Sequence, residues 1–275
     1  RGIHTAWTGA HGPSSVVGLA PSAVAASVLG QEVGMDTDNV AKWLHESIGP
    51  GAATRAARYA DLETTLATLT TALAADPTNP RLRNRLTATQ TRLTEVMALQ
   101  AHYTLKQGQL LIVDEASMAS TSDLAALTDQ AEAAGAKVLL VGDPAQLEAV
   151  DAGGFLGWME RAGHAATLSS VWRFKNDWEA EASLALRQGD TDVITTYAEN
   201  GRLTSCAEGT ATENAYRAWL DTTTSENPPS AILIGADNAD VFDLNQRAQA
   251  DLVAAGRVDP DNGQVRLRAD AHAHI

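Results

Sequence analysis

The sequence predicts an α/β fold built on a parallel β-sheet. Two apolar segments, 110–113 and 138–141, are each followed at once by acidic or amide residues, and a helical pattern over 122–134 separates them. Strands of a parallel sheet are buried on both faces and read as continuous apolar runs, and functional groups gather at their carboxyl ends. We therefore expect neighbouring parallel strands whose polar ends meet at one edge of the sheet.

The segments before these strands also alternate between helix and strand. Residues 3–10 have the pattern of a helix, and 15–19 form a short β-rich run. The alanine-rich stretch 22–29 predicts a helix that Ser22 caps, because a serine hydroxyl can accept a hydrogen bond from a free N–H of the first turn.

A helical hairpin is expected between the first strand and the apolar pair. Over 54–105 leucines recur at helical spacings on both sides of a proline-rich break at 76–80, which is typical of two antiparallel helices with one apolar seam each. Four arginines lie on the second arm: Arg81, Arg83, Arg85 and Arg92. They form either a solvated polar face or a surface that contacts DNA or separates its strands.

A second unit begins near residue 171. Its expected helices cover 177–188 and 241–255, and its expected strands cover 231–234 and 264–267. We accordingly divide the chain into a first domain over 1–170, which contains the hairpin, and a second domain over 171–275.

Composition limits the classes of function. The 275 residues carry a net charge of −14 and a single cysteine, Cys206, and no apolar run is long enough to cross a membrane. We expect a cytoplasmic protein without disulfides or cysteine-based metal sites. The negative charge argues against a protein that simply coats nucleic acid, although seven basic and four acidic residues in 54–106 allow a local basic surface. The start at Arg1, without a leader, indicates a piece of a longer polypeptide.

The strand ends carry groups that phosphoryl transfer from ATP requires. Asp114 follows the first apolar strand and is placed to hold Mg²⁺ through water, and Glu115 is placed to orient and deprotonate the attacking water. Gly142, Asp143 and Gln146 follow the second strand. The glycine permits a tight exit from the strand, and the glutamine amide can report whether a γ-phosphate is present.

Arg173 is a candidate for neutralising charge on the same γ-phosphate. The alternative is a structural arginine stacked on a neighbouring aromatic ring, for which the sequence offers Trp172, Phe174 and Trp178.

Weaker signals point to single-stranded DNA. Pro21 and Ser22 stand where a strand gives way to a helix, so free backbone amides and the hydroxyl can meet a phosphate, or Ser22 is only a cap. Lys42, Trp43 and His45 offer positive charge and a ring on which a base can stack, but a core tryptophan and a surface histidine are equally compatible with the pattern.

Several classes of site are excluded. None of the four lysines follows a glycine, so the phosphate-binding loop Gly-x-x-x-x-Gly-Lys-Ser/Thr is missing from this chain. The seven histidines show no zinc-binding spacing, and no Gly-x-Ser-x-Gly nucleophile is present.

In its motifs the chain resembles the RecD-like branch of superfamily 1 DNA helicases, and most of all the helicase part of MobF-type conjugative relaxases. The matching segments are 18–29, 40–45, 112–118, 141–147 and 168–174. The resemblance implies two RecA-like domains of the P-loop NTPase type, of which this chain lacks the P-loop at the start and the last helicase motifs at the end. It also implies Mg²⁺ at Asp114, water activation at Glu115, and γ-phosphate contacts from Gln146 and Arg173.

The function implied by the resemblance is ATP hydrolysis coupled to translocation on single-stranded DNA and to unwinding, with the rest of a relaxase polypeptide as partner. The chain alone is then expected to be inactive. Two alternatives stay open: a helicase-like module that binds single-stranded DNA without hydrolysis, and a RecD-like repair helicase without a relaxase. The acids and amide at the strand ends argue against a decayed copy.

Overall fold

The computed structural model describes residues 1–146, 154–168, 174–224 and 231–258. The chain divides into two compact units, Arg1–Ser170 and Val171–Ile275. The assignment of these units to two motor domains stays a prediction.

The first unit is built on four parallel strands. These are β1 (Val16–Ala20), β2 (Thr37–Asn39), β3 (Leu110–Val113) and β4 (Lys137–Leu140), in the order β2-β1-β3-β4. The predicted α/β fold with a parallel sheet is therefore confirmed. Strand β2 was not predicted, because it is three polar residues long and has no apolar run to mark it.

Strand β4 forms one edge of this sheet. Among the described residues no strand pairs with its outer side. The strand is correspondingly less buried than β3, and Val141, just after it, is 39% exposed. Within the described part of the chain, this edge thus presents apolar side chains and a row of backbone groups that no strand pairs with.

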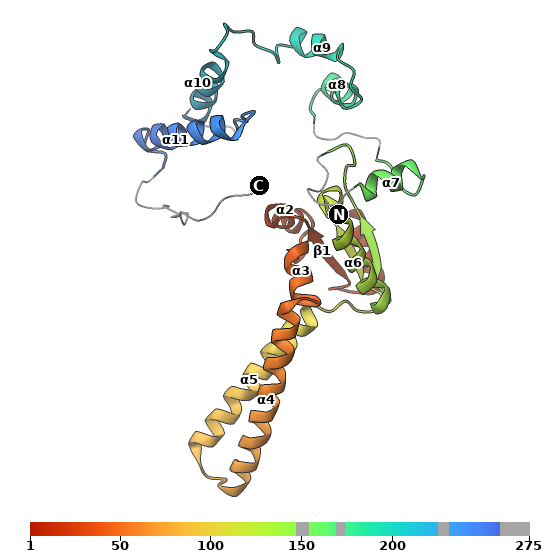
Figure 1. The fold of residues 1–275 in the computed structure, drawn as a ribbon, viewed down its shortest axis with the longest axis vertical. Helices are drawn as coiled ribbons and strands as arrows, with labels where there is room; N and C mark the ends of the chain where they lie inside the picture. The colour runs from red at the N-terminus through yellow and green to blue at the C-terminus, as the bar shows by residue number, and fades with distance from the viewer. Residues whose placement is uncertain (147–153, 169–173, 225–230, 259–275) are drawn as a thin grey trace. The chain divides into compact units, whose positions relative to one another are not determined.

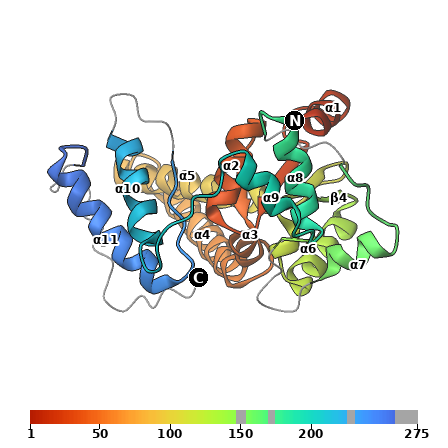
Figure 2. The same ribbon diagram turned by 90° about the horizontal axis from the view of Figure 1, so that it is seen from above.

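Helices cover both faces of the sheet. On one face, α3 (Val40–Ser47) and α6 (Thr121–Ala134) enclose a core that includes Trp43, Leu111 and Leu127. On the other face, Val16, Leu110 and Ile112 pack against Trp7 of α1 (Gly2–His11). Helices α3 and α6 are labelled in Figure 1, and Figure 2 shows the ribbon of the molecule from above, with α1 and α6 labelled. Strand β3 is buried on both sides by these two clusters, which explains its uninterrupted apolar sequence.

Polar residues cap the first turns of several helices. The predicted cap is confirmed, because the Ser22 hydroxyl accepts a hydrogen bond of 3.1 Å from the Ala25 N–H at the start of α2 (Ala23–Val33). Asn39 caps α3 and Ser120 caps α6 in the same way. A single 3₁₀ turn, η1 (Ala116–Met118), and the short helix α7 (Phe155–Arg161) complete the unit.

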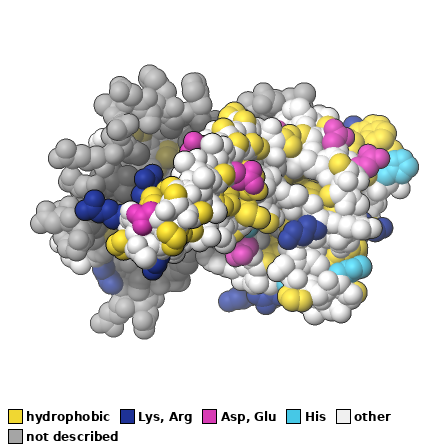
Figure 3. Space-filling model, turned by 90° about the horizontal axis from the view of Figure 1, so that it is seen from below, with side chains coloured by type: hydrophobic (Ala, Val, Ile, Leu, Met, Phe, Trp, Pro, Cys, Tyr) yellow, Lys and Arg dark blue, Asp and Glu magenta, His cyan; other side chains and the backbone are white. Residues whose placement is uncertain are grey.

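The predicted hairpin is confirmed as α4 (Pro50–Ala75) and α5 (Pro80–His102), which extend away from the sheet (Figure 1). Leu62 and Leu69 of α4 and Val96 of α5 are buried in the seam between the arms. At a rise of 1.5 Å per residue the longer arm measures about 39 Å. Figure 3 views the hairpin from its free end, where hydrophobic and basic side chains lie side by side.

A buried arginine joins the hairpin to the domain. Arg55 is only 6% exposed, its guanidinium pairs with the carboxylate and backbone oxygen of Glu46 in α3, and it donates a 3.2 Å hydrogen bond to Gln100 in α5. It also lies over the ring of Tyr103, 5.4 Å from the ring centre, and the Tyr103 hydroxyl donates to Asp38 at 3.1 Å. The base of the hairpin is therefore fixed by polar contacts to two segments of the domain, α3 through Glu46 and β2 through Asp38.

The described part of the second unit consists of four helices: α8 (Asp177–Arg187), α9 (Val193–Glu199), α10 (Ala211–Thr224) and α11 (Asn238–Ala254). The helices predicted at 177–188 and 241–255 are confirmed. The strand predicted at 231–234 is wrong: the segment is irregular, with Ile232 84% and Ile234 87% exposed. An isolated strand gains no backbone pairing, and the described residues offer none there. The strand predicted at 264–267 lies outside the described residues.

No helix in the described ranges is long and apolar enough to cross a membrane.

Replacing Arg55 by alanine should lower the free energy of unfolding by about 2 to 3 kcal/mol, because the partly buried Glu46 carboxylate loses its partner. The measurement is urea denaturation followed by helical circular dichroism. Arg58→Ala, one turn further along α4 and exposed, is the control and should change stability by less than about 0.5 kcal/mol. Equal effects of the two substitutions would contradict the anchoring role.

Candidate functional site

The ends of β3 and β4 are bonded to each other. The two strands pair in register up to Val113 and Leu140. Beyond that pair, the Val141 N–H donates to the Val113 oxygen and the Ala116 N–H donates to the Val141 oxygen, each at 2.8 Å. The Asp114 N–H in turn donates to Leu19 of β1, also at 2.8 Å. The acid pair Asp114-Glu115 thus sits at the centre of the carboxyl edge of the sheet.

The backbone at Glu115 is in the left-handed region, with φ 51° and ψ 37°. Such a conformation costs a side-chain-bearing residue about 1 kcal/mol or more and persists only where the surroundings impose it. Here the turn from β3 into η1 imposes it, since the next N–H is bonded to β4. The Glu115 N–H also donates to the Asp114 carboxylate at 3.1 Å. Both acidic side chains stay half-buried at the edge.

Gly142 is required for space rather than for its backbone conformation. We expected the glycine to permit a tight turn at the end of the strand, but its φ is not positive. Its role in the structure is to make room. A Cβ at this position would lie 3.0 Å from the Ala116 nitrogen and from Leu156 Cδ2, and 3.1 Å from the Ser117 nitrogen. The absent side chain allows the β4 exit to lie directly against the turn that carries the acids.

Gln146 lies at the same edge, on the turn that follows β4. Asp143 organises this turn: its carboxylate accepts from the Ala145 N–H at 3.0 Å and from the Gln146 side-chain amide at 3.3 Å. Gln146 is exposed. The structure therefore brings Asp114, Glu115, Gly142, Asp143 and Gln146 to one edge of the sheet. Arg173 lies outside the described residues.

Ser117 was missed by the sequence reasoning. It is 6% exposed, and its hydroxyl has no hydrogen-bond partner in the described part of the chain. It lies in η1, directly behind the acid pair and against Gly142. Its place three residues after Asp114 was the available signal, but a serine in a turn is too common to be singled out.

The residues predicted to bind DNA lie in different environments. Ser22 is exposed beside Pro21 at the end of β1, with its hydroxyl engaged as the helix cap. Lys42 forms a 2.9 Å ion pair with Asp38, and the hydrogen bond to Asp38 raises the pKa of Lys42 above its usual value. His45 is exposed and lies 3.9 Å from Glu46.

Stacking of a base on Trp43 is wrong for this structure. The side chain is 2% exposed, packs edge-on against Tyr103 at 5.6 Å between ring centres, and donates from Nε1 to Gln130 at 3.4 Å. The alternative interpretation, a core tryptophan, is the correct one. Its neighbours Lys42 and His45 point outward because they lie on the opposite, polar side of a helix whose apolar side meets the sheet.

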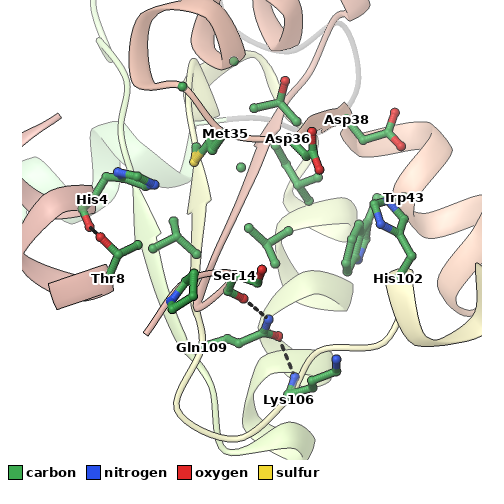
Figure 4. Close-up of a pocket in the computed structure, with 18 of the residues that line it drawn as sticks. His4, Thr8, Ser14, Met35, Asp36, Asp38, Trp43, His102, Lys106 and Gln109 are labelled. Atoms are coloured by element: carbon green, nitrogen blue, oxygen red, sulfur yellow. Dashed lines mark hydrogen bonds between the residues drawn. The ribbon is translucent and has the colours of Figure 1, made fainter. Parts of the chain in front are cut away.

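A pocket of about 820 Å³ lies along β1 rather than at the acid pair (Figure 4). His4 and Thr8 of α1 line one side of it, and Asp36, His102 and Lys106 line others. Of the predicted site residues only Trp43 borders it. The pocket is lined by residues 16–19 of β1 and by Thr37 and Asp38 of β2, and none of the acid-turn residues lines it. It is therefore separate from the edge described above.

The acid pair has the chemistry of a magnesium site. Magnesium keeps several of its water ligands and binds proteins through one or two carboxylates. Asp114, half-buried at the sheet edge, offers one such carboxylate. The described residues contain no cluster of three or more metal-ligating side chains. The residues present therefore fit Mg²⁺, whereas a phosphate-binding loop is not in the sequence.

The pattern of a protein family described as AAA domain matches residues 1–208. The chain belongs to this AAA family. The match covers the whole parallel sheet and both strand ends that carry the acids and the amide, and membership implies nucleotide binding in general.

The chain is also similar to conjugal transfer proteins of three bacteria. The chain is 38% identical over 154 residues to a probable conjugal transfer protein TraA of Sinorhizobium fredii, and 36% identical over 152 residues to a conjugal transfer protein TraA of Rhizobium radiobacter. A TraA of Agrobacterium fabrum is 34% identical over 164 residues. These matches cover 54% to 58% of this AAA chain but only 14% of each relative. The relatives are thus far longer than the part they share with it.

Gly142→Ala should lower stability by about 1 to 3 kcal/mol, because the new methyl group presses on two backbone nitrogens that cannot move independently. The check is a chemical denaturation curve of the 275-residue chain. Gly9→Ala is the matched control: it adds the same atom within α1, where nothing lies within 4 Å, and should be neutral or stabilising by up to about 1 kcal/mol. A neutral Gly142→Ala would show that the two turns are not tightly apposed.

Proposed function

We propose that this chain is the central part of an ATP-driven DNA helicase motor within a longer TraA-like conjugal transfer protein. The observation that carries the proposal is the acid pair Asp114-Glu115 held against the β4 turn at the carboxyl edge of a parallel sheet. Membership of the AAA family supports nucleotide binding, and the TraA relatives support a role in conjugation.

The roles of the side chains follow from their positions. Asp114 would hold Mg²⁺, which when bound neutralises charge on the phosphates of ATP. Glu115, fixed by its left-handed backbone, is the base that orients the attacking water. Gln146, whose amide is held by Asp143 on the neighbouring turn, would report the γ-phosphate. From the sequence, Arg173 is proposed to reach the same phosphate from the start of the second unit.

The partners follow from the same proposal. Single-stranded DNA would meet Pro21 and Ser22, which share the carboxyl edge of the sheet, with Lys42 and His45 on the exposed side of α3. The units 1–170 and 171–275 would be parts of two RecA-like motor domains, with the phosphate-binding loop supplied by another segment of a cytoplasmic relaxase-helicase. We accordingly expect this chain alone to be inactive.

A second candidate is a helicase-like module that binds single-stranded DNA without hydrolysing ATP. It would use the same exposed residues, Ser22, Lys42 and His45, and would need no nucleotide. The organised acid turn favours hydrolysis, since a non-hydrolysing module would have no reason to keep a strained backbone at Glu115.

In the longer protein that contains this chain, Glu115→Gln should reduce the rate of DNA-stimulated ATP hydrolysis by a factor of about 100 or more, because the base is lost while the shape is kept. Affinity for a fluorescent ATP analogue should stay within about threefold. Steady-state hydrolysis and equilibrium binding measure the two quantities.

Glu132→Gln, an equal change of charge on the exposed side of α6, is the control and should leave hydrolysis unchanged. Hydrolysis at the unaltered rate in Glu115→Gln would refute the role of Glu115. If the unaltered long protein binds single-stranded DNA but hydrolyses no ATP, the second candidate is correct.

A further inference from the structure

We propose that one face of the hairpin, formed by Arg81, Arg85 and Arg92 of α5, binds the phosphate backbone of double-stranded DNA. We call these three residues the arginine face. The inference rests on the proposed function in taking DNA as the substrate, and it adds a duplex-binding surface away from the sheet edge.

Helical geometry places the three arginines together. At 100° per residue they fall within about 40° of one another around α5, and at 1.5 Å per residue they span about 16 Å along it. Their neighbours Leu82, Leu86, Thr89, Leu93 and Val96 turn toward α4 and are buried or half-buried, whereas the three arginines are exposed. The arginine face therefore runs along the outside of the rod, beside the seam.

These guanidinium groups are available for a ligand. Several other arginines in the described ranges are paired: Arg55 with Glu46, Arg202 with Glu179, and Arg217 and Arg247 with Glu213. No ion pair or side-chain hydrogen bond of Arg81, Arg85 or Arg92 is found within the described part of the chain.

Charge along α5 also departs from the rest of the protein. The helix contains four arginines and a single acidic residue, Glu95, in a chain whose net charge is −14. Glu95 follows Arg92 by three residues but is not paired with it in the structure. Such local positive charge in an acidic protein is the arrangement expected of a surface that neutralises phosphates.

The form of the surface favours a duplex over a single strand. Proteins that hold single-stranded DNA combine a positive groove with aromatic rings on which bases stack. Here the arginines lie on a convex rod, and the one aromatic residue among Phe, Tyr and Trp between 50 and 102 is Tyr59, whose hydroxyl is bonded to Glu63 at 2.7 Å. The arginines can therefore contact phosphates but offer no ring on which a base could stack. Such contacts suit double-stranded DNA, whose phosphates are exposed while its bases are stacked inside.

The rod is also held in a way that suits such a contact. Arg55 and Tyr103 fix its base to α3 and to the end of β2 through Glu46 and Asp38. A duplex bound along α5 is then kept at a defined position relative to the sheet of the first unit.

The test is binding of a fluorescent 20-base-pair duplex to the 275-residue chain, by anisotropy over a range of salt concentrations. The triple variant Arg81→Ala, Arg85→Ala, Arg92→Ala should bind at least about tenfold more weakly at low salt. The slope of log K against log salt concentration should become shallower by about 2 to 3, since each lost phosphate contact removes about 0.9.

Single variants provide the matched control. Arg85→Ala removes one arginine from the centre of the arginine face, and Arg83→Ala removes one from the opposite side of α5, where its guanidinium donates to the Pro77 oxygen at 2.6 Å. Only Arg85→Ala should reduce the salt slope, by about 0.9. Circular dichroism checks that the variants fold, which is expected because substitutions at exposed positions away from special features change stability little.

Two outcomes overturn the proposal: no change in duplex binding for the triple variant, or a loss confined to a single-stranded oligonucleotide. The proposed function can fail independently. In the longer protein, the triple variant should keep ATP hydrolysis stimulated by single-stranded DNA within about twofold, whereas Glu115→Gln should abolish hydrolysis and leave duplex binding unchanged. If the long protein binds duplex DNA through the arginine face but hydrolyses no ATP, this inference stands and the proposed helicase function is refuted.

Discussion

The hydrogen bonds that join the ends of β3 and β4 determine the geometry of the candidate site. The Val141 N–H donates to Val113 and the Val141 oxygen accepts from Ala116, so that the two strand exits turn as one unit. The left-handed backbone at Glu115 and the missing side chain at Gly142 are consequences of this arrangement. The acids and the amide meet because the sheet is parallel and these bonds leave no freedom between neighbouring turns.

Much of the fold could be predicted because its signals are local. The apolar run of β3 and the leucine seam of the hairpin each report burial directly, and Ser22 marks the start of α2. The strand expected at 231–234 had a similar apolar sequence but no partner in the described structure, and pairing is not a local property. Strand β2 was missed for the converse reason, since its pairing with β1 stabilises residues of low strand propensity.

The candidate site was predictable in position and less so in detail. Sequence placed the acids and Gln146 at strand ends, but it could not show that Gly142 serves to make room or that Trp43 fills the core. Arg55 was overlooked although it lies seven residues before Leu62, on the leucine seam, where a charged residue requires a buried partner. That partner is supplied by α3, which sequence spacing alone cannot place.

The outer side of β4 affects how the protein behaves in solution. Among the described residues no strand pairs with this side of β4. An apolar strand edge without a partner is a template for intermolecular pairing, and proteins suppress such aggregation with charged residues or by covering the strand. In β4 the described protection is a single lysine, Lys137, at its first position. Colloidal stability at high protein concentration is therefore expected to depend on whether another strand pairs with this side of β4.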